Sequence, residues 1–381
     1  MVESAMSRWS TITPRPEQVA AVEAWLRAGG RGVIVMPTGT GKTVVAIHAM
    51  RALGMPKTLI VVPTVKLLKE WRSRLAYALN TFTGSYYNGL KMLSDITVAV
   101  YNSCAANPFI FSFFDFVVFD EVHHLGGEKF AVCLDKVERH RYVMGLTATL
   151  QRLDARHTLI LSKLPLVYKL ELADAKRLGR LAPLEVYAVG VNMSAAEAAE
   201  YHRLTAAISR ILSVNKHDER AYSLISRRKA LLASVSGKRH ALVELVKSLA
   251  GQKILVFSES IESVEVLKEA LEEAGIPSAT YHSQKRSLLR DYVVNAWGRD
   301  FNVLLAVRAL DEGMDVPDVS VGIIIASGKT TRQLVQRMGR LLRPKPDGGK
   351  AQLYVIYCRG TFEWDVVRRI NGLYEGRLRY F

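Results

Sequence analysis

The stretch Met36-Pro37-Thr38-Gly39-Thr40-Gly41-Lys42-Thr43 follows the apolar run Val33–Met36 and precedes a segment compatible with a helix. An apolar strand, a glycine-rich turn and a helix form the context that a phosphate-binding loop requires. Gly39 and Gly41 let backbone N–H groups turn toward phosphate oxygens, and the start of the helix adds positive potential. The strict pattern has a glycine where Met36 stands, so only its second half matches. The stretch predicts an α/β domain that binds a nucleotide.

The residues of this loop have separate expected roles. The segment formed by Thr38, Gly39, Thr40 and Gly41 would surround the phosphates of ATP. Lys42 would reach the β- and γ-phosphates, and the Thr43 hydroxyl would ligate Mg²⁺.

A pair of adjacent acids, Asp120 and Glu121, directly follows the apolar run Phe116–Phe119. In a doubly wound sheet the carboxyl ends of the strands line the ligand crevice. Asp120 would hold the metal ion, and Glu121 would orient and deprotonate the attacking water. An acidic pair at a strand end can also be a solvated loop, but the preceding phosphate-binding loop favours catalysis. His123 is interpreted as a coupling residue, with an ordinary loop histidine as the alternative.

Short apolar runs without alternation occur in two sets, and segments compatible with helices follow them. Such runs suit strands of parallel sheets that are buried on both faces. We therefore expect two α/β domains in tandem. The first set is Val33–Met36, Leu59–Val62, Phe116–Phe119 and Tyr142–Leu146, and the second is Ile254–Phe257, Val303–Val307, Val321–Ile325 and Leu353–Ile356.

The stretch between the two sets has a different, helical character. Ser194 and Glu197 have the spacing of a capping box. Basic residues follow on later helical segments: Arg227, Arg228, Lys229, Lys238 and Arg239. Either a small basic insertion or a linker whose charges keep it soluble would fit. The expected domains are 1–170, a linker with helical insertion at 171–250, and 251–381.

The overall charge favours an acidic partner. The 381 residues carry a formal net charge of +16, which suits a polyphosphate backbone but also a merely solvated basic surface. The three cysteines are scattered and predict neither a zinc site nor a disulfide framework. No apolar run is long enough for a membrane span and no secretory leader is evident, so we expect a cytoplasmic protein, nucleoid-associated if prokaryotic.

The series Asp120-Glu121-Val122-His123 resembles the DExH box of superfamily 2 helicases, and the double histidine resembles their XPB-like branch. This resemblance extends over nearly the whole chain, in the order of the family's motifs. It implies two tandem RecA-like domains with a small helical insertion between them. Arg15 and Gln18 resemble the adenine-reading Q-type motif. The segment Gly145-Leu146-Thr147-Ala148-Thr149-Leu150 is similar to motif III. Its Thr147 and Thr149 would couple the state of the bound nucleotide to the binding of the nucleic-acid strand.

The resemblance also implies nucleic-acid contacts in both domains. In the first domain they would be made by Pro63, Thr64, Asn102, Ser103 and Arg152. In the second domain Ser258, which follows the run Ile254–Phe257, would make one.

Two further resemblances lie in the second domain. Gly313 and Asp315 belong to a motif V-like stretch and would report on the nucleotide. Gln336, Arg340 and Arg343 belong to a motif VI-like stretch and share one helical face. By resemblance that face meets the ATP, where an arginine stabilises charge on the γ-phosphate. A basic helix that contacts nucleic acid or solvent is the alternative.

Two departures from the XPB-like pattern affect the expected activity. The family's Arg-Glu-Asp element is represented by Arg152-Leu153-Asp154, without the acidic middle residue. The chain also begins almost at the Q-type motif, which leaves no room for an N-terminal damage-recognition module. Both points favour translocation or a partner-assisted activity over strong strand separation.

A functional role and a structural role are both conceivable for several aromatic residues and one histidine. The phenylalanines between Phe109 and Phe116 would suit base stacking, but core packing is preferred. Trp71 and Trp297 are also expected in the core, and His282 is expected to be structural.

The resemblance implies an ATP-dependent DNA helicase or translocase with 3′-to-5′ polarity, using ATP and Mg²⁺, with a role in DNA repair and a nuclease partner. An RNA helicase with the same ATPase core remains an alternative, because motifs that bind the nucleic-acid backbone do not distinguish DNA from RNA. A nucleotide-controlled DNA clamp that regulates a partner nuclease is the other alternative.

Overall fold

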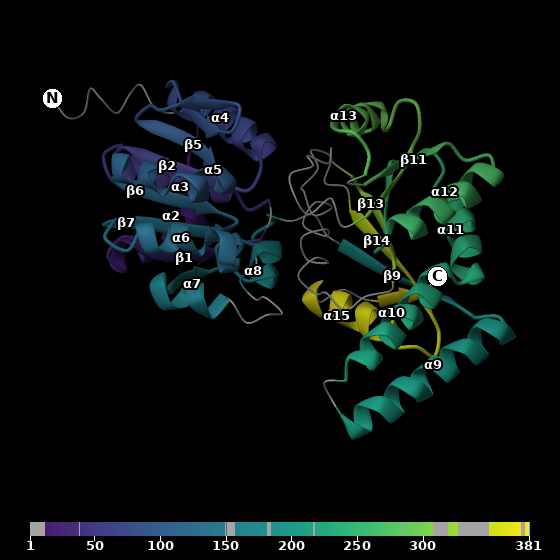
Figure 1. The fold of residues 1–381 in the computed structure, drawn as a ribbon. Helices are drawn as coiled ribbons and strands as arrows, with labels where there is room; N and C mark the ends of the chain where they lie inside the picture. The colour runs from purple at the N-terminus through teal and green to yellow at the C-terminus, as the bar shows by residue number, and fades with distance from the viewer. Residues whose placement is uncertain are drawn as a thin grey trace. The chain divides into compact units, whose positions relative to one another are not determined.

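A computed structural model describes residues 12–37, 39–148, 150, 157–180, 184–215, 218–282, 284–307, 319–326, 350–374 and 378–380. The chain divides into a first compact unit that ends at Leu178 and a second that begins at Gly179. Each unit is built around its own sheet (Figure 1).

The first unit alternates strands and helices. Its strands are β1 (Arg31–Val35), β2 (Thr58–Val62), β3 (Gly84–Tyr87), β4 (Leu90–Met92), β5 (Ile96–Val100), β6 (Phe116–Asp120), β7 (Tyr142–Thr147) and β8 (Leu166–Lys169). Its helices are α2 (Pro16–Arg27), α3 (Lys42–Ala52), α4 (Val65–Leu79), α5 (Tyr101–Ala106), α6 (Glu128–Lys136), α7 (His157–Lys163) and α8 (Leu172–Arg177), with short 3₁₀ helices η1 (Pro108–Phe113) and η2 (Val122–Gly126).

The first sheet has the strand order β4-β3-β5-β2-β6-β7-β1-β8. Its pairs are parallel except β3 with β4. Every residue of β2, β5 and β6 is buried, because helices cover both faces of a parallel sheet. The four strands expected for the first domain are confirmed.

One cluster of buried side chains shows how this sheet is covered. Alternate strand residues, such as Val61 and Val117, pack with Cys104 of α5, Leu134 of α6 and Ile160 of α7. The other face lies against the α2, α3 and α4 helices, which contact β1, β7 and β2 respectively. Both faces are apolar over the central strands, whereas the edge strand β4 is exposed at Leu90 and Lys91.

The second unit repeats this plan. Its strands are β9 (Leu184–Val191), β10 (Ile254–Phe257), β11 (Ser278–Tyr281), β12 (Val303–Ala306), β13 (Val321–Ile325), β14 (Ala351–Cys358) and β15 (Leu378–Tyr380). Its helices are α9 (Ala195–Val214), α10 (Glu219–Ser234), α11 (Ser236–Ser248), α12 (Ile261–Glu273), α13 (Ser287–Ala296) and α15 (Trp364–Tyr374). The sheet order is β11-β12-β10-β13-β14-β9-β15, and its pairs are parallel. The four strands expected for the second domain are confirmed.

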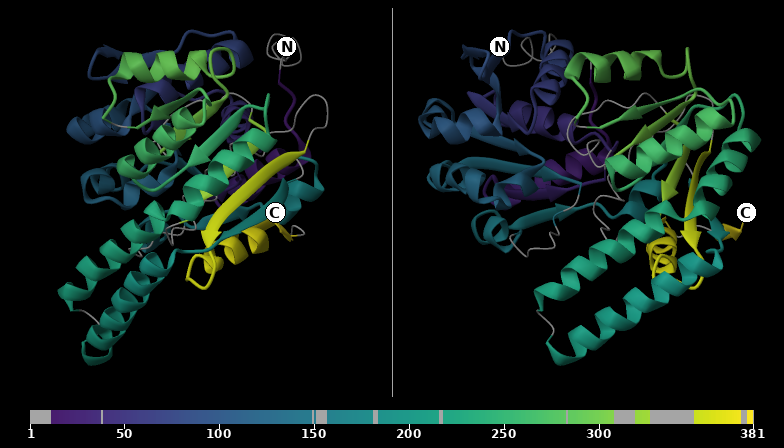
Figure 2. Two further views of the ribbon diagram at one scale, coloured as in Figure 1. Left: turned by 90° about the vertical axis from the view of Figure 1, so that its right-hand side faces the viewer. Right: turned by 45° about the vertical axis from the view of Figure 1, so that its right-hand side comes forward.

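The stretch 171–250, expected to join the two domains, contains a strand of the second sheet. β9 pairs with β14 along its whole length, from Leu184 to Val191, and with β15 on its other side. The part of this stretch that projects from the sheet consists of α9 and α10. These two helices lie side by side as a hairpin (Figure 2). The capping box is confirmed, since Ser194 N donates to Glu197 Oε2 at 2.8 Å and Glu197 N donates to Ser194 Oγ at 3.3 Å.

Lys238 does not belong to a basic surface. It is fully buried on α11, where its Nζ lies 2.7 Å from Oε1 of Glu363 and donates to the Ala326 carbonyl at 2.6 Å. The sequence suggests a solvated lysine, but a fully paired lysine can be buried without an unsatisfied charge. The grouping of Lys238 with the surface arginines was therefore wrong.

The phenylalanine-rich segment divides into two groups. Phe111, Phe114 and Phe116 are buried, as the core reading expects. Phe109 and Phe113 are 67% and 50% exposed and pack edge to face with ring centroids 5.2 Å apart. For these two side chains the prediction of core packing was wrong, because one face of η1 is turned toward solvent. Among the helices of the described residues, none has the length and apolarity needed to cross a membrane.

Candidate active site

The predicted nucleotide-binding residues of the first unit meet at one edge of its sheet. β6, β7 and β1 are neighbours, and all three run in parallel. Asp120 ends β6 and Glu121 follows it, Thr147 ends β7, and the glycine-rich loop follows β1. Because carboxyl ends of parallel strands meet at one edge, the fold brings these three sequence-distant segments together.

The glycine-rich loop needs glycine for steric reasons. Gly39 and Gly41 have φ angles of +88° and +86°, a region that side chains rarely adopt. A Cβ atom at position 41 would also lie 2.3 Å from Nε2 of Gln18. Gly41 is the N-cap of α3, and Lys42, the first residue of that helix, donates to the Met36 carbonyl at 3.3 Å. The loop therefore presents a helix start to an anion, as the sequence predicts.

Gln18 holds this loop from the side. Its Nε2 donates to the Thr40 carbonyl at 2.8 Å, and its Oε1 accepts from the Arg15 backbone N–H at 2.8 Å. Gln18 is buried, whereas the Arg15 side chain is exposed. The structure thus brings the Q-type residues next to the phosphate loop, and Gln18 positions that loop.

Asp120 is buried and held by three groups. Trp71 Nε1 donates to its Oδ2 at 2.7 Å, and the Glu121 backbone N–H donates to its Oδ1 at 3.0 Å. The Tyr101 hydroxyl donates to its backbone carbonyl at 2.9 Å. Burial and the neighbouring Glu121 carboxylate raise the pKa of Asp120 to about 6, against the opposing charge of Lys42. A desolvated carboxylate of this kind gains most from a nearby cation.

Glu121 forms a compact group with His123 and Thr147. The φ angle of Glu121 is +51°, uncommon for a residue with a side chain, and such backbone strain is concentrated at functional sites. Its Oε2 lies 3.3 Å from His123 Nδ1 and accepts from the Thr147 hydroxyl at 3.4 Å. His123 Nδ1 also lies 3.1 Å from Thr147 Oγ1. Burial would raise the pKa of Glu121, but the His123 hydrogen bond and the Lys42 charge lower it, which keeps this carboxylate ionised.

Magnesium would fit the oxygen atoms at this edge. Mg²⁺ prefers carboxylate, hydroxyl and phosphate oxygens. Asp120 offers a buried carboxylate, and Thr43 offers a hydroxyl at the start of α3, one residue after Lys42. The Thr43 hydroxyl accepts a hydrogen bond of 3.0 Å from Arg74 Nη1 on α4. These two residues would hold the metal ion.

The predicted nucleic-acid contacts of the first unit follow β2 and β5, the next two strands along the same edge. Thr64 caps α4, and its Oγ1 accepts from the Leu67 backbone N–H at 3.2 Å. Pro63 and Thr64 are partly exposed, Asn102 is exposed and Ser103 is partly exposed. Nucleic acid bound along this edge would lie beside the nucleotide.

Two residues of the second unit are buried and paired. Ser258, the predicted nucleic-acid contact after β10, is 1% exposed, and its hydroxyl donates to Ser263 Oγ at 2.7 Å. Contact through this side chain remains a prediction. His282 is buried with its Nε2 3.0 Å from Glu265 Oε1, in keeping with a structural role.

Several predicted site residues lie outside the described residues. They are Thr38, Thr149, Arg152, Gly313, Asp315, Gln336, Arg340 and Arg343.

Three contacts of the site were not expected from the sequence: Trp71 with Asp120, Tyr101 with Asp120, and Arg74 with Thr43. Trp71 is in the core, as expected, but its indole N–H reaches the acidic pair. The only sequence signal was its place on the helix that follows β2. Tyr101 directly precedes the predicted nucleic-acid contacts Asn102 and Ser103. These neighbours were the sequence feature that pointed to this position.

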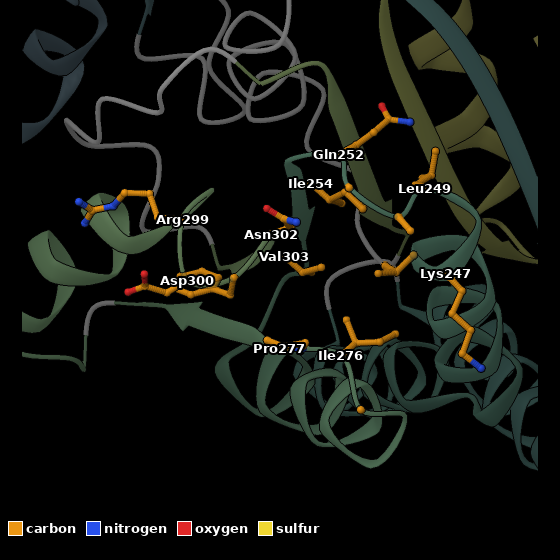
Figure 3. A pocket seen from close by; sticks show the side chains of 15 residues that line it. Lys247, Leu249, Gln252, Ile254, Ile276, Pro277, Arg299, Asp300, Asn302 and Val303 are labelled. Carbon is orange, nitrogen blue, oxygen red and sulfur yellow. The ribbon is translucent and has the colours of Figure 1, made fainter.

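A cavity of about 370 Å³ lies elsewhere, in the second unit (Figure 3). Its walls include Leu249, Ile254, Ile276 and Val303, at the amino ends of β10 and β12. Ser258 follows the opposite end of β10. The cavity therefore lies apart from Ser258, the predicted contact of this unit that the structure describes.

Comparison with protein families gives two matches. Residues 11–152 match the family described as type III restriction enzyme, res subunit. Residues 237–345 match the helicase conserved C-terminal domain.

The chain is also similar to named relatives. It is 31% identical to the DNA 3′-5′ translocase XPB2 of Sulfurisphaera tokodaii, over 94% of this chain and 84% of the relative. It is 29% identical to the DNA 3′-5′ helicase XPB of Kineococcus radiotolerans, over 92% of this chain and 61% of that relative. The chain thus spans less than two thirds of the length of the Kineococcus relative.

Two solved structures share the fold. The Hef helicase domain of Pyrococcus furiosus superposes with a TM-score of 0.63 at 16% identity, over 96% of this chain and 99% of that one. S. cerevisiae Dbp5 bound to RNA and ADP BeF3 gives 0.65 at 15% identity, over 99% and 91%. Both expected RecA-like domains are therefore confirmed as a fold.

Proposed function

Because this chain belongs to the XPB-like branch of the superfamily 2 helicases, we propose that it hydrolyses ATP to move along DNA. The observation that carries the proposal is the shared sheet edge. The phosphate loop, Thr147, the acidic pair and the predicted nucleic-acid contacts lie at the carboxyl ends of five adjacent strands in the order β5-β2-β6-β7-β1.

The residues of the first unit divide the chemistry. The backbone at Gly39 to Gly41 and the Lys42 ammonium bind the phosphates. Glu121, ionised and oriented by His123 and Thr147, holds the attacking water and accepts its proton at a carboxylate oxygen. Mg²⁺, held by Thr43 and Asp120, would neutralise charge on the phosphates when bound.

Arg340 and Arg343 supply the remaining part of the proposal. They would stabilise the charge that develops on the γ-phosphate during hydrolysis, as arginines of the motif VI-like stretch. Gly313 and Asp315 would sense the nucleotide from the same domain. These roles rest on sequence resemblance.

DNA is the proposed track, and 3′-to-5′ the proposed direction. The relatives named above are DNA 3′-5′ helicases or translocases, which favours DNA over RNA. The net charge of +16 supports a polyphosphate track of either kind. A full set of catalytic motifs argues against a clamp that barely hydrolyses ATP.

The partner and the cellular role are finer proposals. The Arg152-Leu153-Asp154 departure supports translocation over strong duplex opening. We therefore propose assistance from a partner, a nuclease in DNA repair, within the cytoplasm.

A displacement assay tests the proposed movement. DNA strands with biotin at either the 3′ or the 5′ end are loaded with streptavidin, and ATP-driven release is followed. Release from the 5′ end alone supports 3′-to-5′ movement. ATP hydrolysis without release from either end would contradict movement along DNA.

A further inference from the structure

Two side chains of one helix contact the two predicted magnesium ligands. Trp71 Nε1 donates to Asp120 Oδ2 at 2.7 Å, and Arg74 Nη1 donates to Thr43 Oγ1 at 3.0 Å. Trp71 and Arg74 are three residues apart on α4, so they lie on the same face of the helix.

The other end of α4 carries a predicted nucleic-acid contact. Thr64 is its N-cap, and the helix continues for 15 residues with Leu68, Trp71 and Leu75 buried against the domain. Seven residues separate Thr64 from Trp71, on the order of 10 Å along a helix. The two helical turns between these positions are packed against the domain and move as one body, so a shift at Thr64 reaches the indole.

We propose that Trp71 and Arg74 are positioning residues that set the affinity of the nucleotide site for Mg²⁺, and that α4 couples this affinity to nucleic acid bound at Thr64. The inference rests on the proposed function and adds the element through which DNA would act on the metal site.

The hydrogen bonds to Asp120 explain why the indole would matter. One oxygen, Oδ1, accepts from the Glu121 backbone, and the other, Oδ2, accepts from Trp71. With a donor on each oxygen the carboxylate cannot rotate, so its remaining lone pairs keep fixed directions. Groups that hold metal ligands in this way typically change metal affinity by about 10- to 100-fold when removed.

Arg74 affects the Mg²⁺ affinity of the site in two opposite ways. Its hydrogen bond fixes the Thr43 hydroxyl, which favours Mg²⁺ binding, and its positive charge repels the cation. The Arg74 side chain is exposed, and solvent screens charges at such positions. We therefore expect the loss of the hydrogen bond to outweigh the loss of repulsion, so that Arg74→Ala weakens Mg²⁺ binding.

The test measures binding rather than turnover. The affinity of a fluorescent, non-hydrolysable ATP analogue is measured with and without Mg²⁺, and the ratio gives the Mg²⁺ enhancement. Trp71→Phe keeps the apolar ring and removes the N–H group. We expect its enhancement to fall about tenfold, with unchanged affinity in the absence of Mg²⁺.

A matched tryptophan provides the control. Trp25 is also fully buried in the first unit, and its Nε1 donates to a backbone carbonyl, that of Val143, at 3.0 Å. Trp25→Phe should keep the wild-type enhancement. An equal loss in Trp25→Phe and Trp71→Phe, or no loss in Trp71→Phe, would overturn the inference.

Arg74→Ala changes an exposed side chain, so it gives an answer even if Trp71→Phe fails to fold. Its enhancement should fall severalfold, whereas Arg72→Ala, two residues away on the same helix, should match wild type. Wild-type enhancement in Arg74→Ala with a lost enhancement in Arg72→Ala would contradict the assignment.

Adding DNA to the same titration tests the coupling. By linkage, DNA that raises Mg²⁺ affinity must bind more tightly when Mg²⁺ is present. We expect DNA to raise the enhancement in wild type and to change it much less in Trp71→Phe. An equal DNA effect in both proteins would refute the role of α4. Absence of any Mg²⁺ enhancement in wild type would instead refute the proposed function.

Discussion

Oε2 of Glu121 and Nδ1 of His123 lie 3.3 Å apart, and the Thr147 hydroxyl lies within hydrogen-bond distance of both. These residues come from the acidic loop after β6 and from the end of β7. The proposed general base is therefore oriented by a residue of the motif III-like segment. Through this contact His123 and Thr147 could exert the coupling role predicted for them, because both lie against the Glu121 carboxylate.

Glu121→Gln should abolish turnover and preserve nucleotide binding. The amide keeps the shape and accepts the Thr147 hydrogen bond, but it cannot take a proton. A positioned general base contributes about 10²- to 10⁴-fold, so single-turnover ATP hydrolysis should slow by that range. Binding of a fluorescent ATP analogue is the control. Near-normal hydrolysis would refute the role of Glu121.

His123→Ala should reduce stimulation by DNA more than basal hydrolysis. The substitution removes the His123 contacts with Glu121 and Thr147, while Lys42 and Asp120 stay in place. We expect the ratio of DNA-stimulated to basal ATPase to fall severalfold. His282→Ala is a matched control, because His282 is also buried beside a glutamate but lies in the second unit. A normal ratio in His123→Ala would indicate an ordinary loop histidine.

Arg340→Ala and Arg343→Ala should lower turnover at saturating DNA with little loss of ATP affinity. Arginines that stabilise charge on the γ-phosphate are worth about 10³- to 10⁵-fold in rate. The rate constant at saturation and the affinity for the ATP analogue separate the two effects. Unchanged turnover with weaker DNA binding would move both residues to the alternative role of a nucleic-acid contact.

DNA affinity should fall steeply as salt increases. A protein that grips the backbone releases counterions, with a log–log slope of about −0.7 to −0.9 per phosphate neutralised. Fluorescence anisotropy across a range of NaCl concentrations measures this slope. A flat response would contradict binding through the backbone and leave the net charge as a solvated surface.

Lys238→Met should destabilise the second unit strongly. It leaves the buried Glu363 carboxylate without its partner, and breaking such a pair costs about 3–5 kcal/mol. Chemical denaturation measures the loss. The double variant Lys238→Met with Glu363→Leu should recover most of the stability, because no unpaired charge remains. An equal loss in both would show that packing, not charge, is responsible.

The sequence predicted the features that depend on local context. Gly39, Gly41 and Lys42 follow an apolar strand and begin a helix, and Asp120 ends another strand. Strand, turn and helix signals within about ten residues identify such a loop, and parallel strands then place the loops at one edge. The order of the motifs led to the assignment of the motif V-like and motif VI-like residues to this site, and that assignment stays a prediction.

The contacts between distant segments could not be predicted in this way. Trp71 and Asp120 are 49 residues apart, and only the packing of α4 on the sheet brings the indole to the carboxylate. Lys238 and Glu363 are 125 residues apart, so the lysine looked like any surface cation. β9 was missed as part of the second sheet because its partner, β14, lies much later in the sequence, close to the C-terminus.

The central claim is that DNA drives ATP hydrolysis by this chain. Steady-state ATPase rates are compared without nucleic acid and with saturating single-stranded DNA, duplex DNA or RNA of matched sequence, with Glu121→Gln measured in parallel for subtraction. We predict that DNA raises the rate severalfold more than RNA does. Equal rates with and without DNA, or stimulation by RNA alone, would contradict the account.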